Sequence, residues 1–238
     1  MGRMTLLSPY VPSSDAIKVS TGTTICAISY DGGVVLACDT RVTVGPFVSN
    51  RGSDKIVPLC DNVHLCRSGS AADTQTVSDY VRYYAEQHAI SLGTDPDVWT
   101  VANLVSQINY RNKHLSAYML VAGWDAAKGG QVFSVVMGGT VVQEKWAIDG
   151  SGSSYIWGVC DAMYKDGMTR EEAEEMAISV TGLALSSDGG SGGMCRLVTI
   201  DKNGVTRRLV RPHEFPPMPF ELVPPEIVEE GSGGMILD

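Results

Sequence analysis

Blocks of strand-like and helix-like hydrophobic spacing alternate along this chain, and their order restricts the fold more than any other sequence feature. A strand block comes first, and a helical pair, a second strand block, a second helical pair and a last strand block follow. Since parallel sheets interleave single strands with single crossover helices, this order predicts antiparallel sheets. The strands are expected at residues 23–30, 34–39, 63–69, 119–124, 131–137, 141–148, 194–200 and 205–210.

The helical blocks carry apolar residues at helical spacing together with capping signals. The first helix is expected from Ser70, with Val81 and His88 on its buried stripe. Asp95 and Pro96 predict the N-cap and the first turn of the second helix. The second pair is expected at residues 156–163 and 169–184, and a T-R-E-E capping box at 169–172 opens its second helix.

Two helix pairs and two groups of antiparallel strands predict an α+β fold, a four-layer α/β/β/α sandwich. Each sheet is then covered by helices on one face and by the other sheet on the opposite face. A strand that is buried on both faces needs no polar alternation, which explains the uniformly apolar run Gly33–Cys38. The Asp31-Gly32 step predicts a tight hairpin before that run.

The composition excludes several function classes. A net charge of -9 and a pI near 4.9 argue against nucleic-acid binding, because no basic excess is available to neutralise phosphates. The six cysteines form no C-x-x-C pair and are expected to be reduced core residues, as in a protein of the cytoplasm and nucleus. No apolar run predicts a membrane span or a secretory signal, so no membrane partner is expected.

The Gly22-Thr23-Thr24 junction carries the chemistry that the sequence suggests. Cleavage after Gly22 gives Thr23 a free α-amine beside its hydroxyl, which places a base and a nucleophile on one residue. The unperturbed pKa of an α-amine, roughly 7.7–8.0, leaves it partly neutral near pH 7 and able to accept a proton. The alternative is that Thr23 only begins a β-strand.

Two other signals are weaker. Residues 189–193 satisfy G-x-S-x-G, but a helix precedes them and a strand follows, whereas a nucleophile elbow needs the reverse order. The four histidines have no metal-ligand spacing, and the sequence predicts neither a metal nor a cofactor. They are His64, His88, His114 and His213.

Five short motifs occur together and in order, and together they are highly specific. They resemble the catalytic beta subunits of the eukaryotic proteasome core, over residues 22 to about 210. The resemblance implies the N-terminal nucleophile hydrolase fold, which agrees with the predicted sandwich. The motifs are G-T-T at 22–24, C-D-T-R at 38–41, S-D-K at 53–55, R-S-G-S-A at 67–71 and D-G-G-S-G-G at 188–193.

The resemblance implies a threonine endopeptidase in which Thr23 is the nucleophile and its freed amine is the base. Lys55 is expected beside Thr23, where an ammonium disfavours a second positive charge on the amine, and Asp39 is expected to stabilise the charge on Lys55. The alternative for the last two residues is an ordinary salt bridge. The supporting positions around the amine and an ordered water are implied at Ser151, Asp188 and Ser191.

The resemblance also implies how substrate binds. The Gly69 amide corresponds to the oxyanion donor, and Thr43 and Ala71 are implied substrate-binding positions. Arg67 lies two residues before Gly69 on one strand face, so it is expected to point toward the first specificity pocket and to favour a carboxylate there. The residues around it resemble the caspase-like subunit, the first of the seven beta types. The alternative is that Arg67 pairs with an internal acid.

The resemblance divides the chain into a propeptide at residues 1–22, a hydrolase domain at 23–211 and a Pro-rich acidic tail at 212–238. Other proteasome alpha and beta subunits in stacked seven-membered rings, and unfolded polypeptide substrates, are the implied partners. Two alternatives remain. A non-catalytic subunit of the same ring is disfavoured because both the Gly22-Thr23 junction and Lys55 are present, and a free-standing amidohydrolase of the same fold predicts a monomer or dimer.

Overall fold

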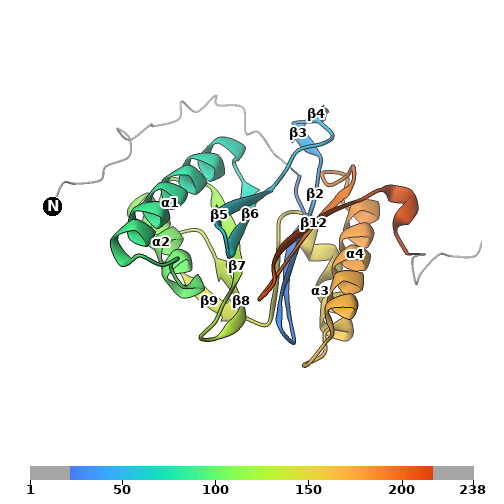
Figure 1. Cartoon of the computed structure of the whole chain (residues 1–238). Helices are drawn as coiled ribbons and strands as arrows, with labels where there is room; N and C mark the ends of the chain where they lie inside the picture. The colour runs from blue at the N-terminus through green and yellow to red at the C-terminus, as the bar shows by residue number, and fades with distance from the viewer. Residues whose placement is uncertain (1–21, 217–238) are drawn as a thin grey trace, which may run out of the picture.

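Two five-stranded antiparallel sheets lie face to face in the computed structural model of this chain, which describes residues 22–216 (Figure 1). Helices α1 and α2 cover the outer face of one sheet, and helices α3 and α4 cover the outer face of the other. The α+β class and the predicted α/β/β/α sandwich are therefore confirmed.

The first sheet contains β1, which begins two residues after Thr23. Its strand order is β10-β1-β2-β11-β12, and every neighbouring pair is antiparallel. The D-G hairpin joins β1 to β2 as predicted, and all seven residues of β2 are buried. The bounds are β1 Ile25–Tyr30, β2 Gly33–Asp39, β10 Trp146–Asp149, β11 Cys195–Asp201, β12 Gly204–Val210, α3 Ser153–Met163 and α4 Arg170–Ser187.

The second sheet contains the strand that carries Arg67 and Gly69. Its order is β5-β6-β7-β8-β9, again antiparallel throughout. A separate two-stranded hairpin, β3 with β4, projects beside β2 (Figure 1). The bounds are β3 Val42–Val44, β4 Phe47–Asn50, β5 Ile56–Cys60, β6 Val63–Gly69, α1 Ala71–Leu92, α2 Val98–Arg111, β7 Ala117–Asp125, β8 Gly129–Val135 and β9 Val141–Glu144.

Three apolar clusters fill the spaces between the four layers. On β6, Leu65 packs toward α1 and α2 while Cys66 packs between the sheets, because side chains alternate along a strand. Met176 of α4 belongs to the third cluster, on the outer face of the first sheet. Each fully buried large apolar side chain contributes about 1.5–3 kcal/mol, so the interior stabilises all four layers together.

The predicted starts were correct for α1 and α4 and wrong for α2. Ser70 is the N-cap of α1, and Thr169 forms the predicted capping box with Glu172. The N-cap of α2 is Asp97 rather than Asp95, because its carboxylate accepts from the Thr100 amide at 2.9 Å. Pro96 therefore precedes the cap instead of occupying the first turn.

The strand predictions need two corrections. The run expected at 141–148 is two strands, because the chain leaves the second sheet after β9, turns at Lys145 and enters the first sheet as β10. Hydrophobic spacing continues through the turn, so it did not reveal the change of sheet. The short strands β3, β4 and β5 were not predicted.

The prediction that His88 lies on the buried stripe of α1 is wrong. The buried residues of that helix end at Ala85, and His88 is exposed.

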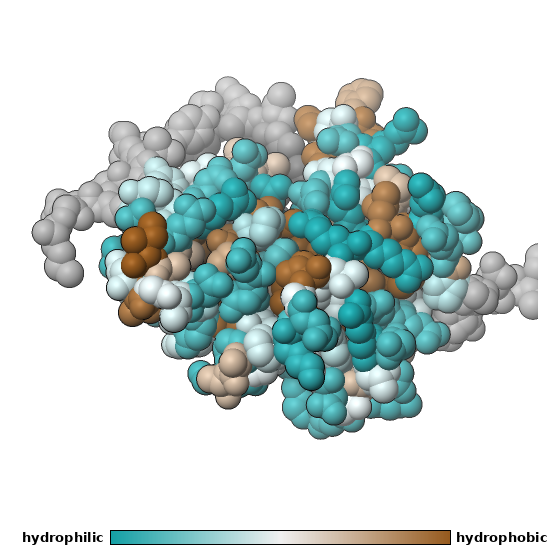
Figure 2. Space-filling view, in the orientation of Figure 1, coloured by the Kyte–Doolittle hydropathy of each residue, from teal (hydrophilic) through white to brown (hydrophobic). Residues whose placement is uncertain are grey.

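The six cysteines are free thiols and five are buried, as predicted. Figure 2 shows one group of exposed apolar residues on the projecting β3–β4 hairpin, where Phe47 is 75% exposed. Within residues 22–216, no helix is long and apolar enough to cross a membrane.

Most of the expected propeptide and tail lies outside the described residues. Gly22 is the last residue of the expected propeptide and is described. The tail begins with a short 3-10 turn, Pro212–Glu214, and Phe215 then packs against the outer cluster of the first sheet.

Candidate active site

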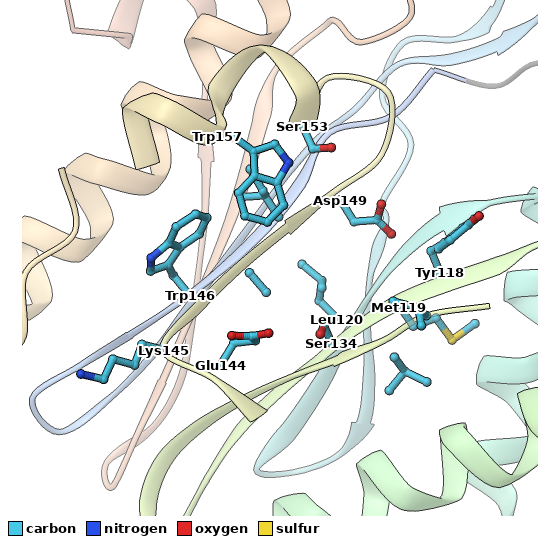
Figure 3. A pocket seen from close by; sticks show the side chains of 14 residues that line it. Tyr118, Met119, Leu120, Ser134, Glu144, Lys145, Trp146, Asp149, Ser153 and Trp157 are labelled. Atoms are coloured by element: carbon cyan, nitrogen blue, oxygen red, sulfur yellow. The ribbon is translucent and has the colours of Figure 1, made fainter. Parts of the chain in front are cut away.

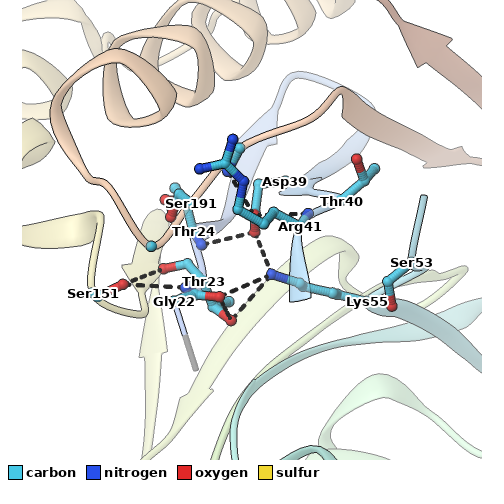
Figure 4. Close-up of polar contacts among 12 residues, drawn as sticks. Gly22, Thr23, Thr24, Asp39, Thr40, Arg41, Ser53, Lys55, Ser151 and Ser191 are labelled. Carbon is cyan, nitrogen blue, oxygen red and sulfur yellow. Dashed lines mark hydrogen bonds and ion pairs between the residues drawn. The ribbon is translucent and has the colours of Figure 1, made fainter. Parts of the chain in front are cut away.

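Thr23 lies at a junction of three strand ends. It lies two residues before β1, and the antiparallel register of β1 with β2 brings Asp39 beside the Thr23-Thr24 segment. Lys55 comes directly before β5 of the other sheet (Figure 4). All three side chains are buried, Thr23 at 5%, Asp39 at 0% and Lys55 at 6% exposure. The site therefore spans both sheets.

The Lys55 ammonium contacts both Thr23 and Gly22 directly. Its Nζ donates to Thr23 Oγ1 at 3.1 Å and to the Gly22 carbonyl oxygen at 3.3 Å. The same Nζ forms an ion pair with Asp39 Oδ1 at 2.6 Å (Figure 4). The predicted neighbours of Thr23 are thus brought together, and the Lys55–Asp39 pair is not an ordinary surface salt bridge, because it is buried and contacts a hydroxyl.

Backbone amides hold the Asp39 carboxylate in place. Oδ1 accepts from the Thr24 amide at 3.0 Å, and Oδ2 accepts from the amides of Arg41 at 3.2 Å and Gly192 at 3.1 Å. Charge-assisted bonds of this kind are among the stronger ones in proteins. Asp39 is therefore rigid, and it fixes the direction from which Lys55 approaches Thr23.

Ser151, Asp188 and Ser191 form a second polar group on the other side of Thr23. The Thr23 amide donates to Ser151 Oγ at 3.1 Å, and Ser151 Oγ donates to Asp188 Oδ2 at 2.7 Å. Ser191 Oγ also donates to Asp188 Oδ2 at 2.7 Å. Burial raises the pKa of Asp188, but bonds from Ser151, Ser191 and two backbone amides outweigh it, so the pKa is lowered overall.

The Gly22–Thr23 peptide bond lies inside this arrangement. Thr23 Oγ1 donates to the Gly22 carbonyl oxygen at 2.7 Å, and the Gly22 amide donates to Thr43 Oγ1 at 3.1 Å. A Cβ at Gly22 would lie 2.1 Å from Cα of Gly190. Glycine is therefore required here by backbone packing, a reason that the sequence alone did not reveal.

A hollow beside Thr23 brings together most of the predicted substrate-binding residues. Arg67, Gly69 and Ala71 line it together with Thr23 and Lys55, whereas Thr43 reaches the site through Gly22. Gly69 has φ of +108° and a Cβ there would lie 2.4 Å from the Ser116 carbonyl oxygen, so only glycine fits at this end of β6.

Arg67 has spare hydrogen-bonding capacity. Its Nη2 donates to the Asp54 carbonyl oxygen at 3.1 Å, while its Nε is buried without a hydrogen-bond partner among the described residues. Within residues 22–216 no carboxylate lies at ion-pair distance from Arg67. The carboxylate of nearby Asp54 pairs instead with Arg196 and Arg207. Burial lowers the pKa of Arg67, and neighbouring acids partly oppose this. Among the described residues Arg67 thus forms no ion pair, which argues against the alternative of an internal ion pair.

The comparisons with known proteins agree with this geometry. A family model described as "Proteasome subunit" matches residues 19–200. The chain belongs to the proteasome subunit family. Its relatives are named as beta-type subunits, so it is a beta-type member, and its sandwich is the N-terminal nucleophile hydrolase fold that the resemblance implied.

Three relatives illustrate the extent of the match. Proteasome subunit beta type-6 of Arabidopsis thaliana is 51% identical, covering 79% of this chain and 81% of its own length. A probable beta type-1 subunit of Schizosaccharomyces pombe is 45% identical, covering 85% and 90% respectively. The beta type-9 subunit of Homo sapiens is 44% identical, covering 89% and 98%.

A larger hollow of about 620 Å³ in this proteasome subunit is a different place. It lies between β7 and β8 on one side and β10 and α3 on the other, with Trp146, Trp157 and Asp149 among its lining residues (Figure 3). Burial raises the pKa of Asp149. Neither Thr23 nor Lys55 lines this hollow, so size does not identify the site.

Sequence reasoning missed two polar residues of the site. Arg41 lies in the C-D-T-R motif, and its Nη1 donates to the Gly189 carbonyl oxygen at 3.1 Å and supports the loop that carries Ser191. Thr24 lies in the G-T-T motif, and its hydroxyl lies 2.7 Å from Ser191 Oγ. Their positions beside assigned residues were the available signal. Among the described residues, no group of His, Cys, Asp and Glu could hold a metal ion.

Proposed function

We propose that this proteasome beta-type subunit is a threonine endopeptidase whose nucleophile is Thr23, released as the first residue of the mature chain. The observation that carries the proposal is the buried Lys55 Nζ, 3.1 Å from Thr23 Oγ1 and 2.6 Å from Asp39. A charged lysine that is buried against a threonine hydroxyl has little value for stability alone, because desolvation offsets much of the ion-pair energy.

The first step is self-cleavage. Thr23 Oγ attacks the Gly22 carbonyl carbon, the carbon–nitrogen bond breaks, and the hydroxyl proton ends on the Thr23 nitrogen. Water then hydrolyses the resulting ester, which frees the Gly22 carboxylate and restores the Thr23 hydroxyl. Lys55, which donates to the Gly22 oxygen at 3.3 Å, stabilises the negative charge that develops on that oxygen.

Peptide hydrolysis then uses the free amine. The amine accepts the proton of Thr23 Oγ, directly or through an ordered water, while Oγ attacks the substrate carbonyl carbon. The Gly69 amide stabilises the oxyanion, and collapse of the intermediate releases the amine product and leaves an ester on Thr23. Water releases the second product. Lys55 disfavours protonation of the amine, and Ser151 with Asp188 orients it.

The proposed specificity is caspase-like, a preference for an acidic residue before the scissile bond. Arg67 lines the hollow beside Thr23, and its unpartnered, buried Nε supports binding of a carboxylate there. Thr43 and Ala71 are also proposed to contact the substrate. The names of the relatives state no such preference, so Arg67 alone carries this part of the proposal.

The proposed assembly is the proteasome core, with other alpha and beta subunits in stacked seven-membered rings that degrade unfolded polypeptides in the cytoplasm and nucleus. A non-catalytic ring subunit does not need the buried Lys55–Thr23 contact. A free-standing amidohydrolase agrees poorly with the high coverage of proteasome subunits. Residues 1–22 are proposed to be the removed propeptide.

The decisive experiment is intact-mass analysis of the subunit in purified assembled particles. The mature chain is expected to begin at Thr23, and Thr23→Ala particles are expected to retain the leader and to lose this subunit's cleavage of acidic fluorogenic peptides. Thr23→Ser keeps a hydroxyl and should retain some of both reactions. Wild-type particles that retain Met1 to Gly22 would contradict the proposal.

A further inference from the structure

Thr24, the residue directly after the nucleophile, has a hydroxyl that no step of the proposed mechanism uses. Its side chain is fully buried, and Oγ1 lies 2.7 Å from Ser191 Oγ. Gly152, directly after Ser151, encloses the two hydroxyls, because a Cβ there would lie 1.9 Å from Thr24 Oγ1 and 3.2 Å from Ser191 Oγ. The backbone at Gly152 therefore packs against both hydroxyls where they meet.

The donor in the hydrogen bond between these two hydroxyls can be identified, because each hydroxyl has only one hydrogen to donate. Ser191 Oγ donates its single hydrogen to Asp188 Oδ2 at 2.7 Å, and the lowered pKa of Asp188 keeps that carboxylate an acceptor. Ser191 must then accept from Thr24. Ser151 likewise spends its hydrogen on Asp188 and accepts from the Thr23 nitrogen.

We propose that Thr24 is a positioning residue, whose hydroxyl fixes the Ser191 hydroxyl on Asp188 and so orients Ser151 and the Thr23 amine. This inference rests on the proposed threonine-peptidase function. Thr24 touches neither substrate nor the reacting atoms, and acts through the chain Thr24, Ser191, Asp188, Ser151 and Thr23. Hydrogen bonds in such a chain polarise one another, so the first donor strengthens the bonds that follow.

Loss of the Thr24 hydroxyl has a specific chemical consequence. The hydroxyl of Ser191, a residue that is only 1% exposed, then has no donor and holds the Asp188 carboxylate less firmly. The carboxylate then keeps more unshared negative charge near the Thr23 amine and stabilises its protonated form. A base with a raised pKa is protonated over a wider range, so the acid limb of the pH profile should move to higher pH.

The test compares Thr24→Val, which keeps the shape but loses the hydroxyl, with Thr24→Ser, which keeps the hydroxyl. Both are assembled into particles with the other active sites inhibited, and both carry a leader that a separate protease removes to leave Thr23 first. Thr24→Val is expected to lower kcat about tenfold, with KM within about twofold, and to move the acid limb upward by about half a pH unit. Thr24→Ser is expected to have a kcat within about threefold of wild type, with the acid limb of its pH profile at the wild-type position.

A matched control and a double variant separate positioning from general stability. Thr199→Val removes another buried hydroxyl, which donates to Glu174 at 2.8 Å on the side of β11 that faces α4, and should leave kcat and the pH profile unchanged. In a Ser191→Ala background, adding Thr24→Val should lower kcat by less than about twofold, because the intermediary is already gone.

The outcomes distinguish the two proposals. Wild-type cleavage equal to that of Thr23→Ala particles overturns both the threonine-peptidase function and the role of Thr24. If the wild-type particles are active and Thr24→Val has a normal kcat and an unchanged pH profile, only the role of Thr24 is overturned. A full tenfold loss on top of Ser191→Ala also overturns it, because Thr24 then does not act through Ser191.

Discussion

Arg67→Leu provides the sharpest test of the proposed specificity. The substitution removes a guanidinium that lines the hollow beside Thr23, and whose Nε has no hydrogen-bond partner among residues 22–216. A charge-assisted contact to a substrate carboxylate contributes about 1.5–3 kcal/mol, so kcat/KM on an acidic peptide should fall roughly ten- to a hundredfold. Cleavage after Leu should fall far less or even rise, because no guanidinium must then lose its solvation.

The measured quantity is the ratio of kcat/KM on a fluorogenic peptide ending in Glu to that on one ending in Leu, with the other active sites inhibited. Arg207→Leu is the matched control, since Arg207 bonds the carboxylate of Asp54 at 2.8 Å but does not line the hollow. That variant should keep the wild-type ratio. An unchanged ratio in Arg67→Leu would refute the caspase-like assignment while leaving Thr23 as the proposed nucleophile.

Three further predictions follow from the buried groups. Lys55→Ala should abolish cleavage and also destabilise the subunit by about 3 kcal/mol, because the fully buried Asp39 loses its cation partner. Particles that still cleave at the wild-type rate would show that Lys55 is not required. Gly22→Ala should slow release of the leader, seen by intact mass, because its Cβ would meet Gly190 at 2.1 Å, and normal processing would contradict that packing. Burial lowers the pKa of His64 to about 4, so between about pH 6.5 and 4 the unfolded chain binds a proton that the folded chain does not. The free energy of unfolding should therefore fall by up to about 3 kcal/mol as the pH is lowered through that range. His64→Leu should remove this pH dependence in thermal unfolding curves, and an unchanged dependence would refute the assignment to His64.

Local features of the chain were read correctly from the sequence. The bounds of β6 at residues 63–69, the capping box at Thr169 and the hairpin at Asp31-Gly32 all follow from spacing or from bonds between residues a few positions apart. The order of strand and helix blocks was enough to predict four layers. The motifs from Gly22 to Gly193 likewise indicated which side chains meet, because their spacing resembled that of a family with a known arrangement.

The tertiary structure decided what depends on contacts between distant segments. The turn at Lys145 follows from a change of sheet, and the exposure of His88 follows from where the buried stripe of α1 ends, so neither appears in the hydrophobic spacing. The need for Gly22 comes from the backbone of Gly190, and the partner of Thr24 is Ser191, more than 160 residues away in the chain. Sequence alone determined which chemical groups this protein has and the order of its elements, whereas the packing of two sheets decided which groups lie within hydrogen-bonding distance.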